Sequence, residues 1–204
     1  MDDHTIRATN DLTALVGSRL CHDLVNPLGA IGNGVELLAM MPGSSGPEVS
    51  LIEDAVRDAQ ARIRFFRVAF GQASVDSRVS QRDIHEIVDG LYGHGGRLSV
   101  TWGPSGDMPR SDAKIALLML SCAEHALPLG GDITVTETAG TFRLDAVSKR
   151  VNADPDLWSM LRTGVAVRNL APSEVQFMLM AQEALRQDRV VRADIAETSL
   201  MLTA

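Results

Sequence analysis

The chain has 204 residues, of which 45% are hydrophobic and 22% are charged, and its formal net charge is −7 at pH 7. This balance is that of an ordinary globular protein with room for one large or two small domains. The acidic charge and the lack of a long basic run argue against nucleic acid or an anionic membrane as a partner. The N-terminus is polar, and no run of about 18 apolar residues occurs, so we expect neither a signal peptide nor a membrane span.

The two cysteines, Cys21 and Cys122, lie in apolar helical patterns and lack the spacing of metal ligands. Such a pattern is typical of reduced thiols in the core of a cytosolic protein. We therefore predict a cytoplasmic protein with two buried thiols and no metal bound by this chain.

The first predicted helix runs from about residue 9, where polar residues offer a start signal, to residue 41. Its apolar residues recur every three or four positions, the period of a helix packed on one side. They are Leu24, Leu28, Ile31, Val35 and Leu38. At about 100° per residue, His22 lies roughly 160° from the centre of this stripe, and Asn26, Gly29 and Asn33 share its outer face. We expect the stripe to be buried and His22 to be exposed.

A turn-forming segment at residues 41–47 precedes a second predicted helix at about residues 48–72. This helix carries a heptad-like apolar seam, made of Val49, Ile52, Val56, Ala59, Ile63, Phe66 and Phe70. Two antiparallel helices cannot bury two such seams fully as a pair, and dimerisation into a four-helix bundle would bury both. The alternative, in which the hairpin packs on the C-terminal part of its own chain, remains open.

Basic residues mark the outer part of the second predicted helix. Arg57 and Arg64 are seven residues apart and share one face, away from the seam. They form either a solvated charged face paired with neighbouring carboxylates, or a surface that binds a phosphoryl group or an acidic partner.

The rest of the chain alternates between helix and strand patterns. After a polar connector, the predicted elements are a helix at 80–91, a strand at 97–102, a helix at 111–126, a hairpin at 132–136 and 141–147, helices at 154–161 and 172–186, and a hairpin at 190–195 and 198–202. This order indicates a mixed sheet covered by helices on one face. We therefore predict an α+β chain, with a helical hairpin in residues 1–76 and an α/β sandwich in residues 77–204.

The segment from His22 to Leu28, His-Asp-Leu-Val-Asn-Pro-Leu, resembles the phosphoacceptor box of bacterial two-component histidine kinases, His-Asp/Glu-Leu-x-Thr/Asn-Pro-Leu. The resemblance implies that His22 is the phosphoacceptor, a role that suits the neutral imidazole as a nucleophile. Asp23 would then accept a hydrogen bond from the other ring nitrogen, unless it is an ordinary surface carboxylate. Asn26, one turn on, would orient a phosphoryl oxygen or a water, unless it is a surface amide.

The order of elements in residues 77–204 resembles the ATP-binding domain that follows the phosphoacceptor hairpin in histidine kinases. Alignment on the Pro-x-Gly-Gly turn at residues 128–131 leaves Cys122 where the kinases have a metal-binding asparagine, and a thiol is a poor ligand for Mg²⁺. Residues 148–152 replace the Asp-x-Gly-x-Gly motif, and no glycine-rich lid occurs. We therefore expect the kinase ATPase-like fold without ATP binding.

A phosphoacceptor hairpin joined to an ATP-less kinase-like domain is the layout of the ChpT-type bacterial histidine phosphotransferases, and the resemblance covers essentially the whole chain. It implies a homodimer that accepts a phosphoryl group from a hybrid kinase's receiver aspartate on His22 and passes it to response-regulator receivers. It implies no bound cofactor, with Mg²⁺ held by the partner receiver. The candidate receiver-binding residues are Arg19, Gly29, Asn33, Arg57 and Arg64.

Three other functions remain open from the sequence. The first is an autokinase with a divergent ATP site, and nucleotide binding would distinguish it. The second is a receiver phosphatase, because residues 23–26 fit the acidic-x-x-Asn/Thr pattern of bifunctional kinases. The third is a non-catalytic module that blocks a kinase or a receiver, with His22 incidental.

Overall fold

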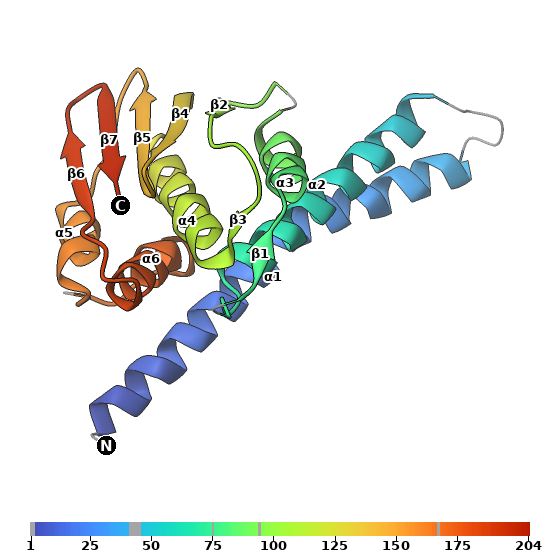
Figure 1. The fold of residues 1–204 in the computed structure, drawn as a ribbon. Coiled ribbons are helices and arrows are strands. Elements are labelled where there is room, and N and C mark those ends of the chain that lie inside the picture. The colour runs from blue at the N-terminus through green and yellow to red at the C-terminus, as the bar shows by residue number, and fades with distance from the viewer. Residues whose placement is uncertain (1–2, 41–45, 75, 94, 167) are drawn as a thin grey trace.

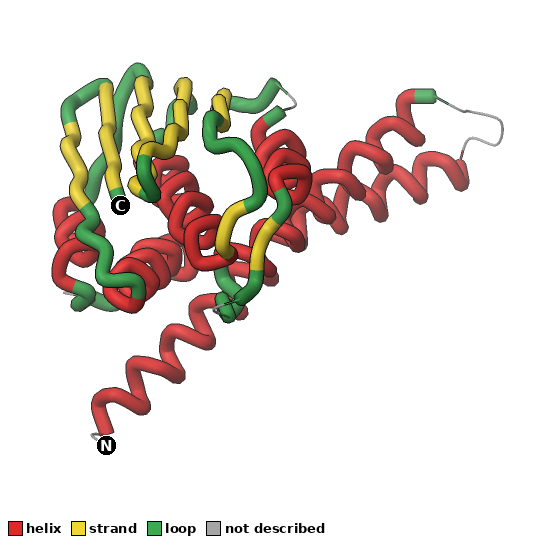
Figure 2. The backbone as a smooth tube through the Cα atoms, viewed as in Figure 1, coloured by secondary structure: helices red, strands yellow, loops and turns green. Residues whose placement is uncertain are grey.

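The computed structural model describes residues 3–40, 46–74, 76–93, 95–166 and 168–204. Two long helices, α1 (Asp3–Met40) and α2 (Pro47–Ala69), lie side by side as a hairpin, and the remaining elements fold against one part of it (Figures 1 and 2). No helix within the described ranges is long and apolar enough to cross a membrane.

The ends of the two long helices differ slightly from the sequence prediction. α1 begins at Asp3 rather than near residue 9, because the polar residues there are tolerated within a helix and none is glycine or proline. Most of the predicted turn lies outside the described residues. α2 begins at Pro47, a residue whose fixed φ suits the first helical position, and ends at Ala69 rather than near residue 72.

Small residues fill the buried side of the hairpin. Among residues 12–38 of α1, the buried ones are Pro27 and Gly34, and the buried residues in the middle of α2 are Ala55 and Ala59. Small side chains let two helices approach closely, so the larger apolar side chains lie on the flanks of the pair.

The prediction that the whole apolar stripe of α1 is buried is therefore wrong within a single chain. Leu28 is 59% exposed and Val35 is 53% exposed, whereas Leu24 is partly buried against the main core. On α2, Val56 is 36% exposed and Ile63 is 48% exposed.

The second part of the chain is built on a five-stranded mixed sheet in the order β2-β4-β5-β7-β6. β2 runs parallel to β4, and the other neighbours are antiparallel, which confirms the predicted mixed sheet. The strands are β2 (Leu98–Trp102), β4 (Gly131–Thr138), β5 (Thr141–Val147), β6 (Arg192–Ile195) and β7 (Ser199–Thr203). A second, two-stranded sheet pairs β1 (Arg78–Val79) with β3 (Met108–Pro109). Sequence patterns missed it, since two residues are too few to show an alternation.

The helices of this part are α3 (Gln81–Tyr92), α4 (Arg110–Ala126), α5 (Pro155–Thr163) and α6 (Val175–Arg186), with a 3₁₀ turn, η1 (Pro172–Glu174), before the last. Capping residues fix where two of these helices begin. The Ser80 hydroxyl accepts from the Asp83 backbone N–H at 3.1 Å, and the Asp154 carboxylate accepts from the Asp156 N–H at 2.9 Å. Both helices begin where the sequence predicted.

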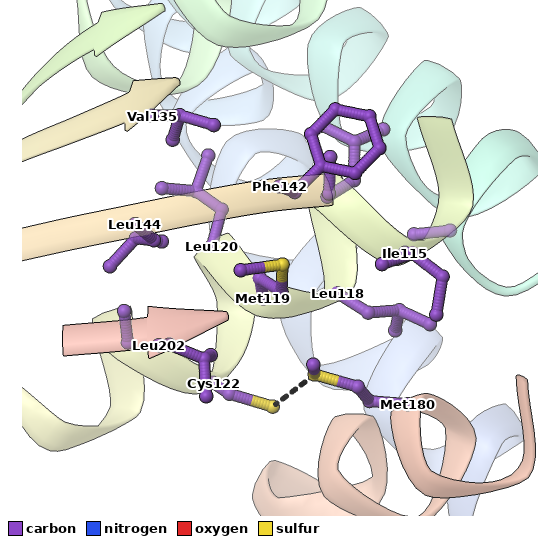
Figure 3. Packing of buried hydrophobic residues seen from close by; sticks show 14 of the residues in the cluster. Ile115, Leu118, Met119, Leu120, Cys122, Val135, Phe142, Leu144, Met180 and Leu202 are labelled. Atoms are coloured by element: carbon purple, nitrogen blue, oxygen red, sulfur yellow. Dashed lines mark hydrogen bonds between the residues drawn. The ribbon is translucent and has the colours of Figure 1, made fainter. Parts of the chain in front are cut away.

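The core lies on one face of the sheet, where α4 and α6 pack, and Figures 1 and 2 show the helices gathered on that side. Figure 3 shows α4 side chains such as Leu118 and Leu120 among inward residues of the strands, including Leu144 and Leu202. The same cluster of buried residues includes Phe65 and other side chains at the end of α2. The hairpin is thus anchored on the sheet-containing part through one continuous core.

Candidate functional site

His22 lies on the middle of α1, at the edge of a cleft of about 430 Å³ between α1 and the helices of the second part. Its side chain is 78% exposed, in line with its expected position on the outer face of the helix. The walls of the cleft come from α1, α4, η1 and α6, and from loops next to the sheet. The lining residues are Arg19, His22, Asp23, Arg97, Ser121, Glu124, His125, Pro128, Ser173 and Gln176.

The carboxylate of Asp23 holds the ring of His22 from one side. Asp23 Oδ1 lies 3.0 Å from His22 Nδ1, and the Asp23 side chain is only 11% exposed. An ionised carboxylate only accepts hydrogen bonds, so this contact favours the tautomer with the proton on Nδ1. The lone pair of Nε2 is then free on the exposed side of the ring, which is the arrangement a nucleophile requires.

Arg19 holds the same carboxylate from behind. Its Nε donates to Asp23 Oδ2 at 2.6 Å, and its Nη1 donates to the backbone carbonyl of Ser173 at 3.1 Å. The Arg19 side chain is 20% exposed. A continuous set of hydrogen bonds therefore runs from His22 through Asp23 and Arg19 to η1. We expected Arg19 on the receiver-binding surface. In the structure its guanidinium instead forms hydrogen bonds with Asp23 and with the Ser173 carbonyl of the same chain.

The far wall of the cleft adds residues that sequence patterns did not assign to the site. Arg97 donates from Nη1 to the Leu127 carbonyl at 2.7 Å and lies 3.5 Å from the Glu124 carboxylate. The pKa of His125 is lowered, chiefly because partial burial disfavours the charged imidazolium. Gln176 is buried, and its Oε1 has no hydrogen-bond partner among the described residues. No signal in the sequence links these residues to His22, because tertiary packing alone brings them there.

A glycine turn sets the position of this wall. Gly130 adopts φ 80°, in the left-handed region, and a side chain there would clash with the Arg97 carbonyl oxygen. The Gly131 N–H donates to that carbonyl at 3.0 Å. The Pro-x-Gly-Gly segment is thus needed for the close approach of the chain just before β2.

Asn26 does not share the cleft of His22. It is exposed and lines a separate cleft of about 480 Å³ with Leu51 and Asp54 of α2. Of the candidate receiver-binding residues, Gly29 and Asn33 are exposed, and a Cβ on Gly29 would meet no atom within 4 Å. The outer face of α1 is therefore bare around Gly29.

The two arginines of α2 named as candidates are both paired. Arg57 Nη1 donates to Asp54 Oδ1 at 3.1 Å, and Arg64 Nη1 donates to Glu86 Oε2 at 2.5 Å. Both arginine side chains keep about half of their surface exposed, 52% and 43% respectively. They can contact a partner while they keep these pairs.

The cysteines occupy different environments. Cys21 is exposed, so its predicted core position is wrong: it precedes His22 on the open side of α1. Cys122 is fully buried, with Sγ 4.0 Å from Met180 Sδ (Figure 3), and burial raises the pKa of its thiol well above the ordinary value. A protonated thiol inside the core does not fit a Mg²⁺–nucleotide complex at this position. The described residues also contain no cluster of three or more side chains suited to a metal ion.

Comparison with known proteins identifies the family. The family model for the histidine phosphotransferase C-terminal domain matches residues 81–199. The chain belongs to the histidine phosphotransferase family. A curated member, the protein phosphotransferase ChpT of Brucella abortus (strain 2308), is 37% identical over 183 residues, which cover 85% of this chain and 87% of that protein. This histidine phosphotransferase is therefore of the ChpT type.

The fold is also similar to that of a solved bacterial phosphotransferase. The structure of a bacterial phosphotransferase matches 95% of this histidine phosphotransferase and 95% of that chain, with a TM-score of 0.77 and 26% sequence identity. The match spans both the helical hairpin and the sheet. The two parts described above thus occur together in a solved bacterial phosphotransferase.

Proposed function

We propose that this chain relays a phosphoryl group in a two-component pathway, accepting it from the receiver aspartate of a hybrid histidine kinase on His22 and passing it to response-regulator receivers. The observation that carries the proposal is the pairing of an exposed imidazole with a shielded carboxylate, at 3.0 Å between His22 Nδ1 and Asp23 Oδ1. Family membership supports the same role. The experiment that tests it is transfer of radiolabel from a phosphorylated receiver onto this protein as an acid-labile, base-stable adduct.

In this reaction His22 Nε2 attacks the phosphorus of the receiver's aspartyl phosphate. The bond between phosphorus and the carboxylate oxygen breaks, the receiver aspartate leaves as a free carboxylate, and the P–N bond forms. The ring gains positive charge as it forms this bond, and the adjacent Asp23 carboxylate stabilises that charge. Transfer to a second receiver reverses these steps. Mg²⁺ would be held by the receiver's acidic pocket.

Receiver docking is proposed on the bare face around Gly29 and Asn33, together with Arg57, Arg64 and Arg19. The open space at Gly29 and the partial exposure of the two α2 arginines support this surface. The protein is proposed to act as a homodimer. The exposed apolar side chains on α1 and α2, Leu28, Val35, Val56 and Ile63, support a four-helix bundle formed with a second copy.

Substitution Asp23→Asn is expected to slow phosphoryl acceptance by about 10-fold or more, within the usual range of acid–base and positioning effects. The asparagine amide carries no negative charge, so it neither stabilises the imidazolium nor forms the ion pair with Arg19. The rate of label transfer from a phosphorylated receiver measures the effect. Asp145→Asn is the control, because Asp145 also binds an arginine at 2.6 Å but lies on β5, outside the cleft. Equal rates for wild type and Asp23→Asn would exclude Asp23 from the mechanism.

The protein is expected not to bind ATP and not to label itself with γ-labelled ATP. The reasons are the buried thiol of Cys122 and the absence of the glycine motifs from the sequence. Calorimetric titration of Mg²⁺–ATP, with an active kinase domain as the positive control, measures this directly. Micromolar affinity together with self-labelling would support the autokinase alternative instead.

A further inference from the structure

Four arginines line one small cleft at the junction of the hairpin and the second part of the chain. Arg64 and Arg67 come from α2, Arg78 from β1, and Arg110 from the first residue of α4. Three other residues, Val68, Val79 and Ile87, form apolar parts of its wall. The chain contains 19 lysines and arginines against 26 aspartates and glutamates, so its overall composition does not explain this concentration of positive charge.

Local hydrogen bonds fix most of these guanidinium groups but use few of their donors. Arg78 Nη2 donates to the Asp107 carbonyl at 2.5 Å, Arg110 donates to the Arg67 carbonyl, and Arg64 pairs with Glu86. Among the residues that the structure describes, the Arg67 guanidinium has no hydrogen bond or ion pair, and this residue is exposed. A guanidinium has five N–H donors, so each of the four arginines keeps donors for a ligand.

Nearby carboxylates do not neutralise the cluster. Asp83 also lines the cleft, and its Oδ2 accepts from the Ser80 hydroxyl at 2.7 Å. Glu86 binds Arg64 and also accepts from Arg82 Nε at 2.8 Å. Even when both carboxylates are counted, the four lining arginines leave an excess of positive charge. Like charges gathered around one small cleft repel one another, and a bound anion would offset the repulsion.

We propose that this cleft binds a free phosphate-type oxyanion. Its volume is about 180 Å³, below the roughly 300–1,000 Å³ of pockets for larger organic ligands, so it suits a small polyatomic anion. The planar fork of arginine matches the oxygen spacing of such an anion, and two or more arginines can bind it at once. This site shares no lining residue with the His22 cleft, although Arg64 also belongs to the proposed receiver-docking surface, and binding of the anion requires no phosphoryl transfer.

The position of the cleft gives the anion a structural effect. Arg67 belongs to the hairpin, whereas Arg78 and Arg110 belong to the elements that follow the connector. A bound anion therefore bridges the two parts of the chain. Since it binds the folded state and not the unfolded chain, it raises the midpoint of thermal unfolding with increasing anion concentration.

Calorimetric titration of inorganic phosphate and of pyrophosphate into the full chain tests the proposal, in chloride buffer at constant ionic strength. We expect saturable binding of one anion per chain, and a rise in the unfolding midpoint that follows the same affinity. Arg67→Gln should weaken the affinity at least about tenfold, the effect of losing one charge-assisted hydrogen bond. Because Arg67 makes no side-chain bond within the described part of the chain, this variant should keep its fold, which circular dichroism checks.

Arg78→Gln gives a second, independent weakening, and Arg143→Gln serves as the matched control. Arg143 lies on β5, where its guanidinium binds Asp145, and it does not line this cleft, so phosphate affinity should not change in that variant. The proposal is overturned by an absence of saturable binding in the wild type, or by an unchanged affinity in folded Arg67→Gln and Arg78→Gln. Neither result touches the phosphorelay role, because no receiver and no phosphoryl transfer enter the assay.

Discussion

Substitution His22→Ala is expected to reduce phosphoryl acceptance from a receiver to background while the fold stays intact. The imidazole is the proposed nucleophile, because its Nδ1 is held by the Asp23 carboxylate and its other ring nitrogen is left for the attack. The His22 side chain is 78% exposed, so its removal deletes little packing. Radiolabel transfer from a phosphorylated receiver measures the activity, and thermal unfolding checks the fold.

Two variants sharpen this result. His22→Gln should be equally inactive, because an amide donates and accepts hydrogen bonds but does not form the P–N bond. His85→Ala is the matched control, since His85 is also exposed and lies on α3, outside the cleft. If His22→Ala still acquires label, the assignment is wrong. The next candidates are then His85, the half-buried His125, and His94, which lies outside the described residues.

Much of the fold was predictable because local signals agreed with the tertiary structure. The caps at Ser80 and Asp154 mark helix starts in the sequence, and the alternating segments around residue 139 form the β4–β5 hairpin. The same signals failed where packing decides. The side of α1 that faces α2 is set by close approach of the two helices at Pro27 and Gly34. The periodic stripe of larger apolar residues does not predict that side.

In the candidate site, too, some contacts could be predicted from the sequence and others could not. The pairing of Arg19 with Asp23 was accessible from sequence, because residues four apart on a helix are neighbours. The contact from Arg19 to Ser173, and the presence of Arg97 and His125 across the cleft, connect residues far apart in the chain. Only the packed structure brings them together. Cys21 was predicted in the core from its apolar surroundings, but it is exposed. A small apolar residue next to an exposed position can itself be exposed.

The apolar face of the hairpin leads to the second large expected effect. Leu28 and Val35 are seven residues apart on α1, and Val56 and Ile63 are seven residues apart on α2, so each pair lies on one side of its helix. All four are at least 36% exposed in the single chain. Exposed apolar side chains at this spacing, on two adjacent helices, are typical of a surface that a second copy covers.

The double variant Val56→Asp/Ile63→Asp is expected to convert a dimer into a folded monomer. Each apolar side chain is worth about 1.5–3 kcal/mol when it is buried. Because Val56 and Ile63 are 36% and 48% exposed in the single chain, a dimer would bury only that remainder of each side chain. Two sites in each of two protomers therefore lose about 3 kcal/mol, which weakens dimerisation by roughly two powers of ten. Desolvation of the new carboxylates adds to this loss. Analytical ultracentrifugation at micromolar concentration measures the oligomeric state.

The fold of this variant should survive, because both positions are substantially exposed within one chain. The control is Val165→Asp/Val190→Asp, which places the same charges at exposed apolar positions of the second part, 61% and 71% exposed, and should leave the dimer unchanged. A wild-type chain that is already monomeric at micromolar concentration contradicts the homodimer. So does a double variant that remains dimeric, since the apolar face of α2 would then not be part of the interface.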